Sequence, residues 1–210
     1  MQHLVQRLRI LRGITRRGLM LACLLGFAVG SAEASPPHAS DWPGDSVYQL
    51  RLSLTDQNGR AFDMDSLGGA PVLVSMFYTS CEFVCPMLVD TMRNAQAQLS
   101  AQERGRLQML LVSIDPARDT VAVLQHTAQE RELDAAQWRL ARTEAPAVRK
   151  LAAVLGIQYR ALPNGDFNHT TALILLDSQG RIVARSTQLG AADPEFVSQI
   201  RKTFAQGVGR

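Results

Sequence analysis

Residues 71–78, Pro-Val-Leu-Val-Ser-Met-Phe-Tyr, constrain the fold of this chain more than any other stretch. An apolar run of this length, interrupted by a single serine, is typical of a β-strand buried on both faces. Leu107 to Ile114 is also mostly apolar and predicts a second buried strand. Strands buried on both faces are covered by helices on each side, so the chain is expected to be an α/β protein.

Helical periodicity and turn residues place further elements between and after these strands. Thr120 is a suitable cap for a helix, and Asp193-Pro194 caps and starts the last one. Residues 177–180 form a hairpin turn. The predicted order is strand 48–54, strand 71–78, a helix through Leu88 and Leu99 that stops before Gly105, strand 107–114, helix 120–132, strand 138–141, helix 145–155, strands 171–176 and 182–186, and a helix from 194.

Two cysteines, Cys81 and Cys85, directly follow the first buried strand and open the first helix. Buried parallel strands, a late antiparallel hairpin and a cysteine pair at a strand–helix junction together predict a thioredoxin-like fold. We expect a central mixed sheet flanked by helices, with an N-terminal strand extension. The domain should span 46–207, after an irregular arm at 35–45 that is rich in proline.

The first 34 residues have the features of an export signal. Five arginines precede an apolar run from Leu19 to Val29, and Ala32-Glu33-Ala34 is a suitable cleavage site. The apolar run is short for a membrane span, so we predict cleavage after Ala34 and a periplasmic protein. An uncleaved anchor in the inner membrane remains the alternative. Arg16-Arg17 resembles a twin-arginine signal, so the export route stays open.

The positive charge of the chain is concentrated in this leader. The net charge is +3, but residues 1–34 hold five arginines and one acid, which leaves 17 basic and 18 acidic residues beyond them. A nucleic-acid-binding protein carries its positive charge on the folded surface. Nucleic acid is therefore not an expected partner.

The cysteines remaining after cleavage suit chemistry better than structural cross-linking. Cys23 lies in the leader, which leaves Cys81 and Cys85 in a compartment that permits disulfides. A disulfide across so short a loop stabilises a fold little. At the start of a helix, side chains four residues apart converge, and the helix terminus favours thiolates. Two convergent thiolates are soft ligands suited to Cu(I).

Imidazole is the usual partner of such thiolates, and three histidines follow the leader. His38 lies in the arm, and His126 is expected to be an exposed residue of the predicted helix 120–132. His169 ends a loop, 163–169, that in a thioredoxin-like domain returns beside the first helix, so it is the favoured third ligand. Three methionines near the cysteines are expected to pack in the core rather than bind copper: Met76, Met87 and Met92.

Three segments, in this order and spacing, resemble the Sco/SenC family. They are Tyr78-Thr79-Ser80-Cys81 with Cys85-Pro86 three residues later, residues 112–120 (Val-Ser-Ile-Asp-Pro-Ala-Arg-Asp-Thr), and His169-Thr170 ahead of a strand that ends at 176–180. Residues 43–48 also resemble the way bacterial members begin.

This resemblance implies a thioredoxin-like copper protein, usually membrane-attached on the extracytoplasmic side. Members bind copper through two cysteines and one histidine and help to build the dinuclear copper centre of cytochrome c oxidase. Carried over by position, the metal ligands are Cys81, Cys85 and His169. Members typically have Pro-Asp after the first cysteine, where this chain has Glu82-Phe83. The resemblance therefore carries over the ligand set but not the partner surface or the copper affinity.

Asp115 and Arg118 belong to the second matching segment. In the predicted fold they either support the metal ligands from behind or form an ordinary strand end with a helix cap. The sequence leaves both interpretations open.

Two functions share the cysteine pair. The leading hypothesis is a monomeric copper metallochaperone that serves the copper-site subunit of a cytochrome c oxidase or a related copper protein. The alternative is a thiol–disulfide reductase that acts on the cysteines of that partner. Both need Cys81 and Cys85, a pair that can also form a redox disulfide, but only the first needs His169. A peroxidase is a remote third hypothesis, because Thr79 lies nearby but the sequence identifies no accompanying arginine.

Overall fold

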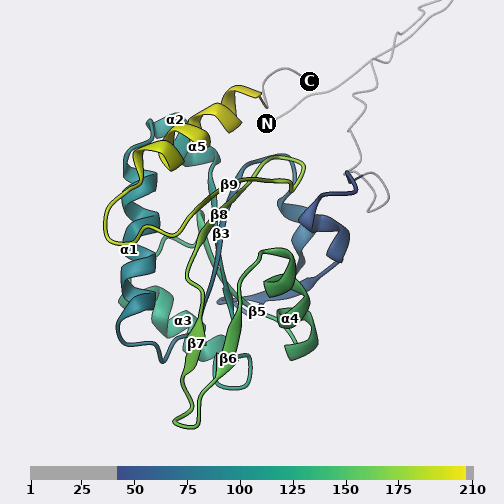
Figure 1. Cartoon of the computed structure of the whole chain (residues 1–210), viewed down its shortest axis with the longest axis vertical. Coiled ribbons are helices and arrows are strands. Elements are labelled where there is room, and N and C mark those ends of the chain that lie inside the picture. Colours follow the sequence, from purple (N-terminus) through teal and green to yellow (C-terminus); the bar gives the residue numbers. More distant parts are fainter. Residues whose placement is uncertain (1–41, 207–210) are drawn as a thin grey trace, which may run out of the picture. The chain divides into compact units, whose positions relative to one another are not determined.

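Val72–Phe77 (β3) is an interior strand of a seven-stranded sheet and is buried along its whole length. The computed structural model describes residues 42–206 (Figure 1). Around β3 the strands and helices are β1 (Ser53–Asp56), β2 (Ala61–Asp63), α1 (Val84–Ala97), α2 (Ala101–Arg106), β4 (Gln108–Ser113), α3 (Val121–Glu130), β5 (Trp138–Arg142), α4 (Ala145–Val154), β6 (Tyr159–Ala161), β7 (Phe167–His169), β8 (Leu173–Leu176), β9 (Ile182–Ser186) and α5 (Pro194–Gln206).

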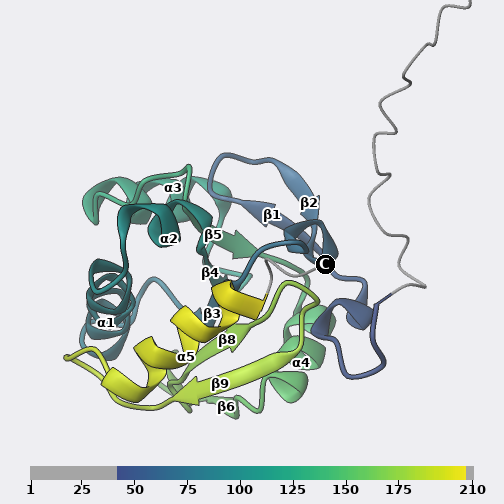
Figure 2. The same ribbon diagram turned by 90° about the horizontal axis from the view of Figure 1, so that it is seen from above.

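The strand order across the sheet is β2-β1-β5-β4-β3-β8-β9. The β3–β4 and β4–β5 pairs are parallel, and all other neighbours are antiparallel. Because crossovers between parallel strands are right-handed, two steps in the same direction place α1 and α3 on one face. The chain then returns past β4 and β3 to β8, which places α4 on the other face. Figure 2 shows this arrangement, with α5 on the side of α1.

This mixed sheet between helices confirms the predicted thioredoxin-like fold. The two buried strands, the short strand near Trp138 and the hairpin of β8 and β9 lie where the sequence predicts them. The Thr120 hydroxyl accepts the Val123 N–H at the start of α3, and the Asp193 carboxylate accepts two N–H groups at the start of α5. These elements are confirmed because burial and capping are local signals.

The predicted strand at 48–54 is wrong over its first half. Val47–Leu50 is a 3₁₀ helix (η1), and the strand begins only at Ser53. The Ser46 hydroxyl accepts the Tyr48 N–H and so caps η1. The buried Tyr48 ring packs edge-on against Trp42, with 5.0 Å between centroids. Alternating hydrophobicity was misleading here because tertiary packing of the aromatic side chains sets the backbone.

The predicted single helix through Leu99 is two helices. Ser100 caps α2 in a reciprocal arrangement with Glu103, which ends the first helix and starts the second. Gly105 lies inside α2 rather than beyond a helix end. This Ser-x-x-Glu pattern marks the start of a new helix, which hydrophobic periodicity alone does not show.

The leader, Cys23 and His38 lie outside the described residues, as does most of the predicted arm. The end of the arm belongs to the folded part, since Trp42 is buried beside Gly68. Between residues 42 and 206, no helix is both long and apolar enough to cross a bilayer. The short helix η2 (Met64–Leu67) completes this N-terminal packing.

Candidate metal centre

The two cysteines lie at the carboxyl end of β3, where the sheet changes direction. On one side β3 pairs with the parallel strand β4, and on the other with the antiparallel strand β8. The Ile114 N–H donates to the Phe77 carbonyl at 2.8 Å, so the chain segments leaving β3 and β4 begin side by side. Loops at such a point can converge on one site, which is where ligands bind in open α/β sheets.

Cys81 is a half-buried free thiol in the loop just before α1. Its Sγ accepts the backbone N–H of Cys85 at 3.3 Å. Burial alone would raise the pKa of Cys81, but hydrogen bonds from the Cys85 thiol and from the N–H groups of residues 83–85 outweigh it and lower the pKa. The free N–H groups at the start of α1 therefore favour a thiolate at Cys81.

Cys85 is the second residue of α1 and is only 5% exposed. Burial raises its pKa far above that of an ordinary thiol, and the neighbouring Cys81 sulfur adds to this. The two thiols converge as predicted, but the predicted reason is wrong. Cys81 precedes the helix, so the convergence comes from the loop folding back over the first turn rather than from helical spacing.

His169 is the last residue of β7, so its predicted position in a loop is wrong. Residues 159–161 and 167–169 pair as a separate two-stranded hairpin. The strands were missed because each has only three residues, and the turn is closed by local bonds such as Gly165 N–H to the Leu162 carbonyl at 3.0 Å. Gly165 has φ of 87°, a conformation that glycine adopts without strain.

The His169 ring is half-buried, and burial lowers its pKa, which favours the neutral imidazole. Its Nδ1 lies 3.3 Å from the Thr170 carbonyl oxygen. In the tautomer that donates this hydrogen bond, Nε2 keeps its lone pair for a ligand.

Tyr78 adjoins both the cysteines and His169. Its ring packs edge-on against Phe167 and His169, with centroid separations of 5.2 and 5.8 Å. Its hydroxyl accepts the Phe167 N–H at 3.4 Å. Burial and the adjacent Cys81 both raise the pKa of Tyr78. Tyr78 belongs to one of the segments that resemble the family, but the sequence alone does not show that it lies at the site.

The structure brings two of the three predicted ligands together. The Cys81 sulfur accepts hydrogen bonds from the backbone N–H and the thiol of Cys85, while the His169 ring lies against Tyr78. Within residues 42–206, no three His, Cys, Asp or Glu side chains are grouped closely enough to hold a metal ion.

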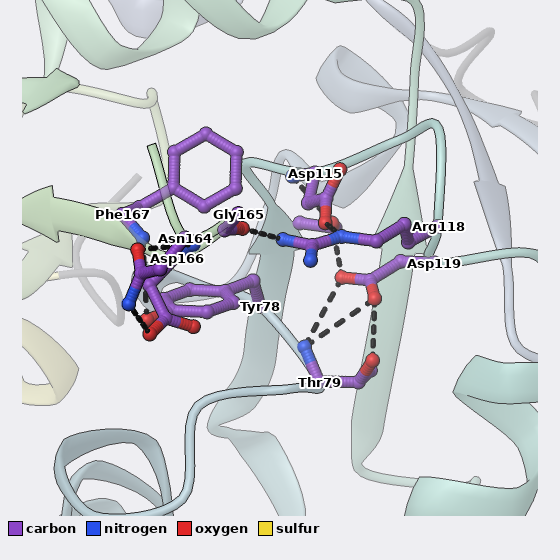
Figure 3. A network of polar contacts seen from close by, with 10 residues as sticks. Tyr78, Thr79, Asp115, Arg118, Asp119, Asn164, Gly165, Asp166 and Phe167 are labelled. Carbon is purple, nitrogen blue, oxygen red and sulfur yellow. Dashed lines mark hydrogen bonds and ion pairs between the residues drawn. The ribbon is translucent and has the colours of Figure 1, made fainter. Parts of the chain in front are cut away.

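The two further candidates, Asp115 and Arg118, form an ion pair just after β4 (Figure 3). A second Arg118 nitrogen donates to the Gly165 carbonyl in the hairpin turn, and the guanidinium carbon lies 5.9 Å from the centre of the Phe167 ring. The helix cap is provided by Thr120 and not by this pair. Arg118 therefore connects the end of β4 to the hairpin that carries His169.

Asp119 is a buried carboxylate that sequence reasoning assigned to no role. It accepts hydrogen bonds from the Thr79 hydroxyl at 2.5 Å and from the Thr79 N–H (Figure 3). The Ser113 hydroxyl also donates to it, at 2.5 Å. Burial raises its pKa, although these donors oppose the shift. Ser113, a polar residue that follows the apolar run 109–112 in β4, was the available signal for a buried hydrogen-bonding partner.

The remaining candidates, three methionines and His126, differ in whether their side chains are buried or exposed. Met76 and Met92 are buried, which confirms core packing, but Met87 is 44% exposed, so the core prediction is wrong for it. Met87 is the fourth residue of α1, and Phe83, the residue just before the helix, is 79% exposed. His126 is exposed as predicted and lies 3.3 Å from Glu130 on the same helix.

Comparison with known proteins identifies a family. The sequence model of the SCO1/SenC family matches residues 43–205. Protein SCO2, mitochondrial, of Saccharomyces cerevisiae is 32% identical over 74 residues, which cover 35% of this chain and 25% of that protein. The matches cover about a quarter to a third of the first curated relatives' own lengths.

Solved structures show the same fold. A SCO1/SenC family lipoprotein from Bacillus anthracis superposes with a TM-score of 0.67 at 20% identity, covering 73% of this chain and 92% of that one. Bradyrhizobium japonicum ScoI, solved with copper bound, gives a TM-score of 0.59 at 24% identity, covering 72% and 96%.

Proposed function

This chain belongs to the SCO1/SenC family, and from that premise we propose that it binds copper through Cys81, Cys85 and His169. The family is known for copper-binding proteins of cytochrome c oxidase assembly. Copper is here a cargo that the protein receives and passes on. The observation that carries the proposal is the Cys81 sulfur at the start of α1, which accepts the Cys85 backbone N–H at 3.3 Å and a hydrogen bond from the Cys85 thiol.

The donor set suits copper in its reduced state. Cu(I) prefers soft thiolate ligands, and imidazole complements them. Hydrogen bonds from the start of α1 favour the Cys81 thiolate, and the lowered pKa of His169 favours a neutral imidazole with a free lone pair. Cys85 must lose its proton to bind the metal, because burial keeps its thiol protonated and a thiolate is the form that coordinates copper.

We propose that the cargo passes to the copper-site subunit of a cytochrome c oxidase or a related copper protein. Cys81 is half-buried at the surface, and the exposed side chains of Phe83 and Met87 flank the cysteine loop. Apolar side chains beside the donor atoms offer contact area to a partner that approaches the thiols. Oxidation of the pair to a disulfide would remove both thiolate ligands at once.

A thiol–disulfide reductase is the second candidate, and the difference between the two thiols favours it. An accessible thiolate attacks a disulfide, and a second thiol then resolves the mixed disulfide. Cys81 has the exposure and the lowered pKa of an attacking group, and the buried Cys85 is placed to resolve. This reaction does not need His169.

Copper stoichiometry tests the proposal. The reduced domain is expected to bind one copper per chain, and Cys81→Ser or Cys85→Ser should abolish tight binding while the circular dichroism spectrum stays unchanged. His126→Ala is the matched control, because this exposed histidine lies on α3 and should not affect binding. Full stoichiometry in a double serine variant would refute the assignment.

A paired measurement on His169→Ala separates the two candidates. If the protein captures copper, losing one ligand should weaken Cu(I) affinity at least about tenfold, or about 1.4 kcal/mol. Reduction of a peptide disulfide should stay nearly unchanged, because both thiols remain. Unchanged copper affinity with collapsed reductase activity would favour the reductase.

We also propose that the protein acts in the periplasm after its leader is removed. The arginine-rich start, the apolar run and the Ala-x-Ala site support this. N-terminal sequencing of exported protein should find Ser35 first. A chain that still begins upstream of Leu19 would show an uncleaved anchor instead.

A further inference from the structure

We infer that Arg118 is the positioning residue for His169: it ties the β6–β7 hairpin to the end of β4 and so sets where the imidazole stands relative to the thiols. This inference rests on the proposed copper function. It concerns a residue that touches none of the proposed ligands, and it follows from three contacts of one guanidinium group (Figure 3).

The hairpin needs an external anchor. Its two strands pair only with each other and are not part of the seven-stranded sheet. Each strand has three residues, and an isolated two-stranded hairpin is at best marginally stable in water. The position of His169, at the end of β7, therefore depends on the contacts that attach the hairpin to the rest of the domain.

Arg118 supplies such contacts at the turn and on the face of the hairpin. One guanidinium nitrogen donates to the Gly165 carbonyl, and the group lies over the Phe167 ring at 5.9 Å. The Arg118 side chain is 47% exposed, so the charge of its ion pair contributes little to stability. The planar guanidinium group nevertheless fixes the directions of its hydrogen bonds. A lysine cannot reproduce this, because its single nitrogen does not bridge two acceptors in one plane.

The other end of the anchor is fixed in the core. Arg118 Nε donates to Asp115, whose side chain is only 8% exposed. The Asp115 N–H donates to the Ser113 hydroxyl at 2.9 Å, and that hydroxyl donates to Asp119. A series of hydrogen bonds thus runs from the buried end of β4 through Arg118 to the hairpin.

This anchor acts on His169 through Phe167. Residues two apart on a strand point to the same face, and both rings pack against Tyr78. Tyr78 in turn follows β3 and precedes the cysteine loop. Because Arg118 holds Phe167 in place, it also fixes the position of the His169 ring relative to the two thiols.

The test is a double-mutant cycle with Arg118→Gln and His169→Ala. In the native background, Arg118→Gln should weaken Cu(I) affinity about tenfold, the usual effect of removing a residue that orients a ligand. In the His169→Ala background it should have no further effect, because the ligand that Arg118 positions is gone. Equal weakening in both backgrounds would overturn the inference. Arg118→Lys should restore less than half of the loss in logarithmic affinity, and full restoration would also contradict it.

Arg139→Gln is the matched control. Arg139 of β5 lies over the ring of Phe62, in the edge strand β2, at 5.1 Å, so it is an arginine stacked on an aromatic ring of the main sheet rather than of the hairpin. Its replacement should leave copper affinity unchanged.

Amide hydrogen exchange of the metal-free protein separates a failure of this inference from a failure of the copper proposal. Arg118→Gln should speed exchange at Leu162, Gly165 and Thr170, whose N–H groups are bonded within or beside the hairpin, and leave β3 unchanged. Unchanged hairpin exchange would overturn the inference even if copper binds. Faster exchange in a protein that does not bind copper would refute the copper function while the anchor itself stands.

Discussion

Cys81 and Cys85 are four positions apart, yet their surroundings give them opposite properties. Cys81 receives hydrogen bonds from the start of α1, which lower its pKa, whereas burial raises the pKa of Cys85. The sequence predicts the spacing and the helix, but it cannot show that Cys81 lies ahead of the helix with its sulfur over the free N–H groups. That depends on the path of a three-residue loop.

This difference predicts the order in which the thiols react. In the reduced, metal-free protein, iodoacetamide should modify Cys81 first. The rate should rise with pH around a midpoint below the 9.0 of an ordinary thiol, because the thiolate is the reactive form. Peptide mapping by mass spectrometry at several pH values gives both results. In urea the two cysteines should react alike, and faster labelling of Cys85 in the folded protein would contradict the account.

Among the elements, the N-terminal 3₁₀ helix η1 shows why local patterns fail. Its sequence alternates like a strand, but its position is fixed by contacts with residues far along the chain. The Val47 N–H donates to the Gly180 carbonyl at 2.9 Å, and the Ser46 hydroxyl donates to the Gln179 carbonyl at 2.6 Å. Propensity is a weak signal where such tertiary contacts decide the backbone.

Gly180 is the residue that makes this docking possible. A Cβ there would lie 2.5 Å from a Tyr48 ring carbon, and its φ is 77°. Gly190 has φ of 90° with nothing within 4 Å, so Gly190→Ala should cost only the backbone term of about 1–2 kcal/mol. Gly180→Ala should cost about 1–3 kcal/mol more, because overpacking adds to it. Urea denaturation of both variants measures the difference, and equal losses would show that η1 does not dock tightly.

The last helix, α5, carries a pH-dependent cap. Hydrogen bonds from the Ser186 hydroxyl and from the N–H groups of Phe196 and Glu195 lower the pKa of Asp193. A carboxylate with a lowered pKa stabilises the fold above its unfolded pKa near 3.8, and this contribution disappears as pH falls through the folded value.

Asp193→Ala should therefore reduce the free energy of unfolding by about 1 kcal/mol at pH 7. The loss should be smaller at pH 3. Glu195→Ala, in the same helical turn, should change stability by only a few tenths of a kcal/mol. Urea titrations at the two pH values provide the measurement. A loss that grows on acidification would have the wrong sign for this cap.

Over the whole molecule, the sequence patterns that predict the fold correctly are those that mark buried residues. The apolar runs of β3 and β4 and the cysteines between strand and helix predict the sheet, its helical layers and the edge where the site lies. What the sequence does not show is the short hairpin that carries His169 and its attachment by Arg118. Strands of three residues leave no periodic signal, and long-range contacts of one arginine leave none at all.

The central claim is that Cys81, Cys85 and His169 bind one metal, although the imidazole packs against Tyr78 rather than against the cysteines. X-ray absorption at the copper edge tests it most directly, because it reports the type and number of atoms bound to the metal. The Cu(I)-loaded protein and its His126→Ala variant should show two sulfur ligands and one nitrogen. His169→Ala should show the two sulfurs alone. A nitrogen ligand that persists in His169→Ala, or one that is missing from the native protein, would contradict the account.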